Sequence, residues 1–266
     1  AIPELADALK WARAQWDESE NEAPWDVNNP LKIFVAKGTY TPLYSAVDGE
    51  YTQDGGRDNA FVLIPNVQLF GGFDPLNGVR NLNDPRILPT EEGQGTILSG
   101  FITESGERVF HVVISIGEMG SALLNGFSIT EGNADGTFSQ SITVRQEPEI
   151  RKFGGGGMYN VSNICVEQVH IRNNYARVGA AWLNLTGEPF VKNVRIYDNQ
   201  SGPMPSAWYN NDGNPTLVNV FIRHVNDSWY QANGSPLLVN STILGNWAIG
   251  TITEPINITL QNSLLI

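Results

Sequence analysis

The stretches VKNVRI (191–196), LVNVFI (217–222) and LVNSTI (238–243) share one pattern: an apolar residue, a variable residue, asparagine, two variable residues and isoleucine. CVEQVHI (165–171) and LLNGFSI (123–129) carry variants of it upstream, and Leu260-Gln261-Asn262 begins it again. The anchors are Asn125, Gln168, Asn193, Asn219, Asn240 and Asn262, at spacings of 43, 25, 26, 21 and 22 residues. Self-similarity at this period is typical of a stacked repeat architecture.

A second element lies nine residues before four of these anchors. It reads AWLN (181–184), AWYN (207–210), SWYQ (228–231) and GTIT (250–253), and GMYN (157–160) matches one residue closer to its anchor. The repeats are rich in β-branched residues and asparagine, whereas leucine-rich repeats of similar length need a leucine consensus. The sequence therefore predicts a parallel β-solenoid, with one coil of short strands for each repeat.

The recurring asparagines have a structural explanation in such a stack. A side-chain amide that recurs once per coil can bond to its equivalents above and below, and this satisfies polar groups along the stack. We therefore expect a structural ladder through Asn193, Asn219, Asn240 and Asn262. A second ladder is expected through Asn174, Asn199 and Asn246.

Composition excludes several functions. The formal net charge of −12, with 16 basic and 28 acidic residues, argues against nucleic acid and anionic membranes as partners, because both attract clustered Lys and Arg. Cys165 is the single cysteine, so an intrachain disulfide and a Cys-x-x-Cys pair are excluded. No apolar run approaches the roughly 20 residues that span a bilayer, so we expect no membrane insertion in this segment.

The chain before residue 154 is less regular. Leu5, Leu9, Ala12 and Trp16 share one helical face, which predicts an amphipathic helix within residues 1–22. Residues 31–153 hold short β-prone runs and insertions, and residues 154–266 hold the regular coils. We expect one β-helix domain over residues 1–266, and a sequence that stops inside a repeat is expected to be a fragment of a longer protein.

These segments resemble a known family. LKIFVAKGTYTP (31–42), the run from Phe61 to Phe73, TILSG (96–100) and GGGGMYN (154–160) look like the secreted right-handed parallel β-helix repeat proteins of bacteria. These share the pectate-lyase-like fold, and polymorphic outer membrane protein-type repeats are nearest in style. The resemblance implies an N-terminal capping helix and an extracellular or bacterial cell-surface location. It is weak for function, because the fold is shared by lyases, glycosidases, adhesins and proteins without assigned activity.

Strand alternation suggests where a ligand could bind. Small residues flank the column Tyr159, Leu183, Tyr209, Tyr230, Ile252, which suggests that this column faces inward. Trp182, Trp208 and Trp229 would then face outward beside Asn184, Asn210 and Gln231, and would form an aromatic platform edged by amides. Sugar rings bind such surfaces. The alternative is that the tryptophans fill the interior of the solenoid.

Catalytic signals are weaker. Enzymes of this fold use clustered aspartates with a basic residue, and no such cluster is evident; the aligned repeats offer only His170, Arg195, Asp198 and His224, with Arg223 beside them. An ordinary solvated surface with incidental ion pairs explains these residues better. No metal site is assigned and no cofactor is expected; the loop Asp54 to Asn59 carries carboxylates that could hold calcium, but a plain polar loop fits it better.

The sequence thus favours a non-catalytic, secreted or cell-surface β-helix module that binds glycan or another surface partner through an exposed aromatic and asparagine column. Two alternatives stay open. One is a polysaccharide lyase or glycoside hydrolase that acts on the outer sheet face. The other is a structural stalk that displays further domains.

Overall fold

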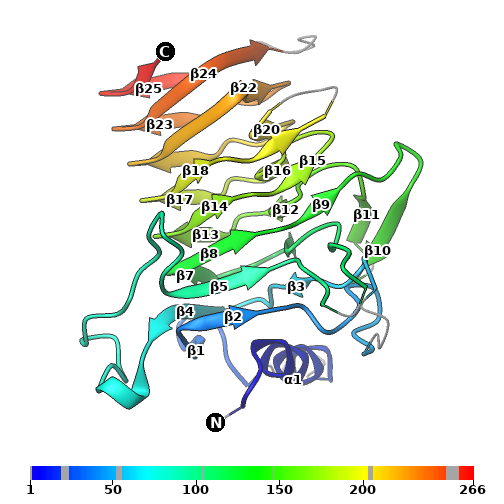
Figure 1. The fold of residues 1–266 in the computed structure, drawn as a ribbon, viewed down its shortest axis with the longest axis vertical. Coiled ribbons are helices and arrows are strands. Elements are labelled where there is room, and N and C mark those ends of the chain that lie inside the picture. Colours follow the sequence, from blue (N-terminus) through cyan, green and yellow to red (C-terminus); the bar gives the residue numbers. More distant parts are fainter. Residues whose placement is uncertain are drawn as a thin grey trace.

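The chain folds into an elongated right-handed parallel β-helix, as the sequence predicts (Figure 1). The computed structural model describes residues 2–18, 24–51, 56–103, 105–145, 147–202, 206–249 and 258–266. Each coil contributes short strands to successive faces, and equivalent strands of neighbouring coils pair in parallel. The right-handed crossover follows the general preference of parallel strands.

The first face is a sheet of eight parallel strands. Their order is β1 (Leu31–Ala36), β4 (Val67–Phe73), β7 (Leu123–Asn125), β13 (Cys165–Glu167), β17 (Phe190–Lys192), β21 (Thr216–Val218), β23 (Leu237–Val239) and β25 (Thr259–Gln261). The pairing joins Leu124 to Val166, Val191 to Leu217, and Leu238 to Leu260. The last four anchor spacings, of 25, 26, 21 and 22 residues, are therefore the true coil lengths. The first spacing was one residue too long, because Asn125 pairs with Glu167 and not with Gln168.

The second and third faces join at one end of the molecule. The second contains β2 (Gly38–Tyr40), β5 (Thr96–Ser99), β8 (Phe127–Thr130), β14 (His170–Arg172) and β18 (Arg195–Tyr197). The third contains β3 (Phe61–Val62), β6 (Val113–Gly117), β12 (Met158–Ser162), β16 (Trp182–Thr186) and β20 (Trp208–Asn210). The long strands β22 (Phe221–Gln231) and β24 (Thr242–Ile249) run across both faces, and β26 (Leu264–Leu265) pairs with β24.

Coil length explains why the two faces join. The longer coils insert a corner strand between the second and third faces, namely β9 (Asn133–Ala134), β15 (Tyr175–Ala176) and β19 (Gln200–Ser201). The coils that follow are shorter by three to five residues, and in them one continuous strand replaces the corner. The change from spacings of 25 and 26 to 21 and 22 residues thus records the loss of a corner.

Three additions interrupt the coils of the N-terminal half. The described residues 42–51 and 56–60 (the 42–60 loop) lie between β2 and β3, and residues 74–95, with the 3₁₀ helix η1 (Pro75–Asn77), project as the cyan loop in Figure 1. The antiparallel hairpin β10 (Ser141–Val144) and β11 (Glu147–Arg151) lies outside the third face. The helix α1 (Leu5–Glu18) covers the first coil, with Leu5, Leu9 and Ala12 buried as predicted.

Candidate functional site

The predicted aromatic platform is wrong, because the tryptophan column faces inward. Trp182, Trp208 and Trp229 are all 0% exposed. Their indole rings stack along the helix axis, with centroids 4.6 Å apart between the first two and 5.2 Å apart between the second and third. The interior is wide enough to hold one indole in each of three successive coils. The indoles therefore stabilise the core and offer no surface to a ligand.

The column continues differently from the sequence alignment. Trp247 pairs with Trp229 and is packed against the core, whereas the alignment had placed Thr251 there. Because this coil has no corner strand, the part of β24 that lies on the third face begins four residues earlier in the sequence than the alignment predicted. Thr251 and Ile252 lie outside the described residues.

The amides predicted to bind ligand also lie inside. Asn184, Asn210 and Gln231 are 0% exposed. Asn160 donates to Asn184 Oδ1 at 2.6 Å, and Asn184 donates to Asn210 Oδ1 at 2.6 Å. Asn160, Asn184 and Asn210 thus form an internal amide ladder that satisfies buried polar groups. Gln231 accepts a hydrogen bond from Trp229 Nε1 at 3.0 Å, so the role of these amides is structural.

The ladder predicted at the anchors has a different basis. Asn193, Asn219, Asn240 and Asn262 have φ of 54°, 60°, 48° and 48° at the corner between the first and second faces. Asparagine tolerates this left-handed conformation better than most residues. Asn219 donates to Asn193 at 2.9 Å, but Asn219, Asn240 and Asn262 are exposed, so backbone conformation rather than buried amide pairing explains the repeat.

The second predicted ladder is confirmed in part. Asn174 and Asn199 are buried, and the Asn174 amide donates to Asn199 Oδ1 at 3.1 Å. Asn246 is exposed and pairs through its backbone with Asp227, so it does not continue this ladder.

The column predicted to face inward lies on the outside. Tyr159 and Leu183 are buried there by the hairpin and the 42–60 loop, which contribute Val144, Ile150 and Ala60 to a second apolar cluster. Tyr209 and Tyr230 are partly buried, and their rings are nearly parallel at 4.6 Å. Because rings stacked along the axis present edges rather than faces to solvent, this pair is a poor platform for a sugar ring.

The polar patch predicted on aligned coils is divided between separate contacts. His170 is 8% exposed, and its Nδ1 lies 3.3 Å from the Tyr197 hydroxyl. Burial lowers its pKa to about 4, and the adjacent Arg195 guanidinium adds to this effect. Arg195 is bound to Glu91 of the 74–95 loop at 2.6 Å. His170 and Arg195 thus contact the underside of a loop and hold it against the second face.

The other two candidates take no part in that contact. Asp198 forms an exposed ion pair with Arg223 at 3.1 Å, and His224 Nε2 lies 3.4 Å from the Ser201 hydroxyl. Of the suggested calcium loop, Asp54 lies outside the described residues and Asp58 forms an ion pair with Lys152 at 2.7 Å. Among the described residues, no group of three His, Cys, Asp or Glu side chains could hold a metal ion.

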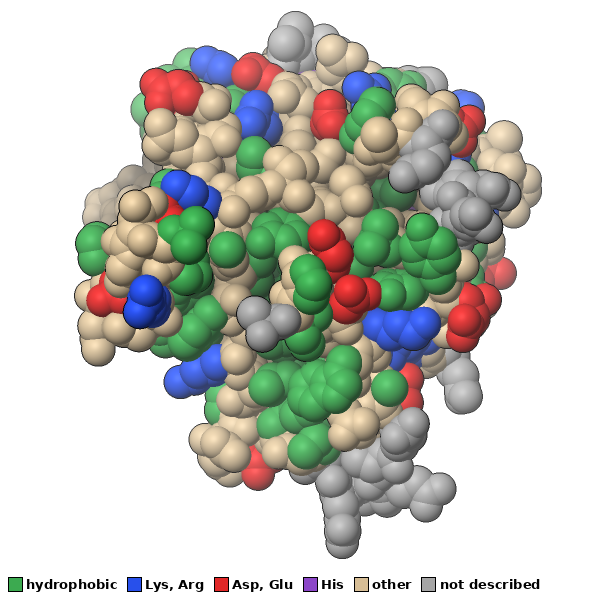
Figure 2. Space-filling view, turned by 60° about the horizontal axis from the view of Figure 1, so that its bottom comes forward, with side chains coloured by type: hydrophobic (Ala, Val, Ile, Leu, Met, Phe, Trp, Pro, Cys, Tyr) green, Lys and Arg blue, Asp and Glu red, His purple; other side chains and the backbone are tan. Residues whose placement is uncertain are grey.

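A groove at the N-terminal end is a concave site large enough for a ligand. Its volume is about 620 Å³, within the usual range of ligand sites. One wall is α1, with Leu5, Ala8 and Trp11; the other is β1, and Phe73, Pro75 and Arg80 complete the lining. Figure 2 shows this end of the molecule, where hydrophobic side chains gather between charged groups of both signs.

Two half-exposed aromatic side chains face this groove. Trp11 is 48% exposed and Phe34 is 45% exposed. Trp11 rests on buried Trp25, with ring centroids 6.0 Å apart, and Trp25 donates its indole N–H to the Pro65 carbonyl at 3.0 Å. Phe34 stacks on Phe73 at 4.7 Å. One side of each ring therefore packs against another aromatic ring, and the other side is accessible from the groove.

The rim of the groove is polar and of mixed charge. Glu4 and the exposed side chains of Lys32 and Arg80 line it. At one end Lys37 binds Asp74 at 2.6 Å, and the Lys37 contact is the largest cause of a lowered Asp74 pKa. A neutral ligand with many hydroxyls suits apolar walls with donors and acceptors of both kinds.

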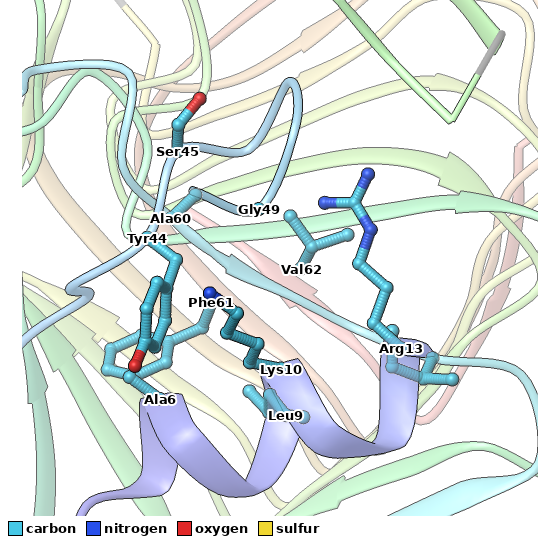
Figure 3. A pocket seen from close by; sticks show the side chains of 11 residues that line it. Ala6, Leu9, Lys10, Arg13, Tyr44, Ser45, Gly49, Ala60, Phe61 and Val62 are labelled. Carbon is cyan, nitrogen blue, oxygen red and sulfur yellow. The ribbon is translucent and has the colours of Figure 1, made fainter. Parts of the chain in front are cut away.

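A cavity on the other side of α1 is too small for such a ligand. It lies beneath Tyr44, Arg13 and Phe61 and has a volume of about 30 Å³, room for about one water molecule (Figure 3). Arg13 donates to the carbonyls of Ala46 and Val47, and Lys10 lies over the Tyr44 ring. These contacts fix α1 in place, and so they also fix the wall of the groove.

Sequence reasoning missed this site for identifiable reasons. Trp11 stands off the apolar face of the helix formed by Leu5, Leu9 and Ala12, and an apolar residue off that face was the available signal. Phe34 lies one residue from buried Val35, so alternation places it outside. Their approach across the first coil depends on how α1 docks, which no local pattern encodes.

The comparisons with known proteins add little. No family model matches the chain, and no curated protein matches it. One solved structure, pectin methylesterase in complex with a hexasaccharide, matches with a TM-score of 0.42 and 10% identity. The match covers 94% of this chain and 77% of that chain. At this level the likeness carries no argument about function, and the sheets themselves establish the β-helix. In the described residues no helix is long and apolar enough to cross a membrane.

Proposed function

We propose that this chain is a non-catalytic β-helix module of an exported or surface protein and that it binds a neutral glycan. The observation that carries the proposal is the groove between α1 and β1, where Trp11 and Phe34 are half exposed and firmly backed. Sugar rings stack an apolar face on such rings while their hydroxyls reach polar groups at the rim.

The surface chemistry supports a neutral ligand. The net charge of −12 repels anionic polymers at long range, and the rim holds Glu4 beside Lys32 and Arg80 rather than a basic cluster. Arg195 is paired with Glu91, and Asp198 is paired with Arg223. These pairings favour binding over cleavage at the predicted polar patch, because acid–base catalysis needs groups that converge on a substrate.

The test is a glycan-array screen of the wild-type chain, followed by calorimetric titration of each bound glycan and an assay for cleavage products. Trp11→Ala and Phe34→Ala should each weaken binding at least about tenfold, because each removes a stacking surface. Phe138→Ala is the matched control, since Phe138 is 61% exposed and lies outside the groove.

Thermal unfolding of each variant separates a lost contact from a lost fold. Unchanged affinity in a folded Trp11→Ala and in Phe34→Ala would place the ligand elsewhere. Product release would favour the lyase or hydrolase alternative. A screen without any bound glycan would contradict the proposal and favour the structural stalk.

A further inference from the structure

We infer that the ligand of this groove is an extended, unbranched oligosaccharide that lies along β1 and continues beyond it into a second hollow on β2. This inference rests on the proposed function and adds the length and direction of the ligand. It is carried by the continuity of two hollows along one stretch of chain.

The linings of the two hollows follow one another along the chain. The groove is lined by the consecutive residues 32–36 of β1, and a hollow of about 510 Å³ is lined by the next three, Lys37, Gly38 and Thr39. The opposite wall of this hollow comes from Ile87 and residues 93–95 of the 74–95 loop. One unbroken segment of backbone thus forms a side of both spaces.

The groove runs along the edge of β1 rather than over one of its faces. Side chains of a strand alternate between two faces, so a space that touches five consecutive residues meets the strand from its edge. β1 is the terminal strand of the first face and, among the described strands, pairs with β4 alone. Its other edge carries backbone N–H and C=O groups outside any ladder, a regular row of donors and acceptors for repeated hydroxyls.

The junction between the hollows is polar and partly open. The Lys37 side chain is 49% exposed where it binds Asp74, whose side chain is 7% exposed. Asp74 also accepts a hydrogen bond from Asn77 at 2.7 Å. The pair forms a fixed polar step between the spaces, and the remaining Lys37 donors can meet a hydroxyl of a chain that passes over it.

The two hollows differ in the shape of their walls. The groove provides aromatic faces, whereas the second hollow is lined by Lys37, Thr39 and Gln94 together with three glycines and two isoleucines: Gly38, Gly93, Gly95, Ile87 and Ile97. A Cβ at Gly95 would lie 2.6 Å from the Ile87 carbonyl oxygen, so backbone itself forms part of this wall. One end of the ligand is therefore anchored by stacking on aromatic rings, and the other packs against backbone and aliphatic side chains.

The experiment measures affinity against ligand length. The probes are neutral linear oligosaccharides of two to eight rings, of the sugar and linkage that the array identifies, titrated into the full chain. In the wild type, affinity should rise at least about tenfold from the shortest to the longest probe. Thr39→Trp should abolish this rise and leave the affinity for the shortest probe unchanged, because Thr39 is exposed in the second hollow.

Thr259→Trp is the matched control, since Thr259 is an exposed strand threonine at the opposite end of the β-helix and should leave the rise intact. Equal affinity for short and long probes in the wild type would overturn the extended ligand while the proposed function stands. A rise that persists in Thr39→Trp would also overturn it. Failure of every probe to bind the wild type would contradict the proposed function itself.

Discussion

The two halves of this β-helix place their irregularity in different positions. Residues 31–153 carry loops and a hairpin between short strands, and the hollows described above border α1, the 42–60 loop or the 74–95 loop. Residues 154–249 hold the regular coils, and their largest side chains, Trp182, Trp208 and Trp229, stack in the interior. Regular stacking makes a strong core and a flat surface, whereas departures from it make concave sites.

The largest expected effect tests the regular half. Trp208→Ala should destabilise the fold by about 3–5 kcal/mol, because it empties a fully buried site between two stacked indoles. Urea unfolding measures the loss, and Trp208→Phe should cost less. Binding of any glycan by the folded fraction should be unchanged. If the Trp208→Ala variant were stable but no longer bound glycan, the regular half would carry the binding site, and the proposed contrast between the two halves would be wrong.

The second test measures how the stability of the N-terminal half depends on pH, through the buried side chain of His111. His111 is 2% exposed with Nδ1 3.0 Å from the Gly155 carbonyl oxygen, and burial lowers its pKa to about 4. Asp58 opposes this lowering and Lys152 reinforces it. Because the folded pKa lies below the ordinary 6.5, His111 contributes its full stability above pH 6.5 and loses it as the pH falls toward 4.

The loss at His111 could reach about 3 kcal/mol over that window. His170, under the 74–95 loop, has a pKa lowered to about 4 and adds a loss of the same sign. Urea unfolding at pH 7.5, 5.5 and 4.5 should give a shallower pH dependence for His111→Asn than for the wild type. If the wild type and His111→Asn had the same pH dependence, His111 would take up no proton on unfolding, and its pKa would not be lowered in the folded protein.

A smaller effect is expected from the internal amide ladder of the regular half. Asn184→Ala should cost about 1–3 kcal/mol, because it leaves the Asn160 donor and the Asn210 acceptor of the ladder without this partner. Chemical denaturation measures the loss, and Asn83→Ala at an exposed site is the control. Equal stability of the two variants would contradict the ladder.

The smallest effect concerns the repeated corner. Asn219→Ala should cost about 1 kcal/mol, because alanine is strained at a φ of 60°, while Asn219→Gly should cost less. The difference between the two variants in urea unfolding isolates the backbone contribution from the hydrogen bond to Asn193. If glycine were the more costly replacement, amide pairing rather than conformation would explain the repeated asparagine.

Much of the fold was readable because repeats report stacking directly. The anchor spacing gave the coils, and Leu5, Leu9 and Ala12 gave the capping helix. The candidate site was not readable. Trp11 and Phe34 belong to elements that meet only after α1 docks on the first coil, and the inferred platform used the wrong side of the third face.

The sequence by itself determined that this chain forms a parallel β-helix, how long its regular coils are and that Trp182, Trp208 and Trp229 share a column. Tertiary structure alone decided which column faces inward. Alternation states that Trp208 and Tyr209 point to opposite sides, but both columns of the third face are apolar, since the hairpin and the 42–60 loop cover much of the outer one. When an outer face is covered, its residues are apolar, and the polar residues that normally mark the outside of a sheet are missing. Only the position of the docked insertions therefore shows which column faces inward.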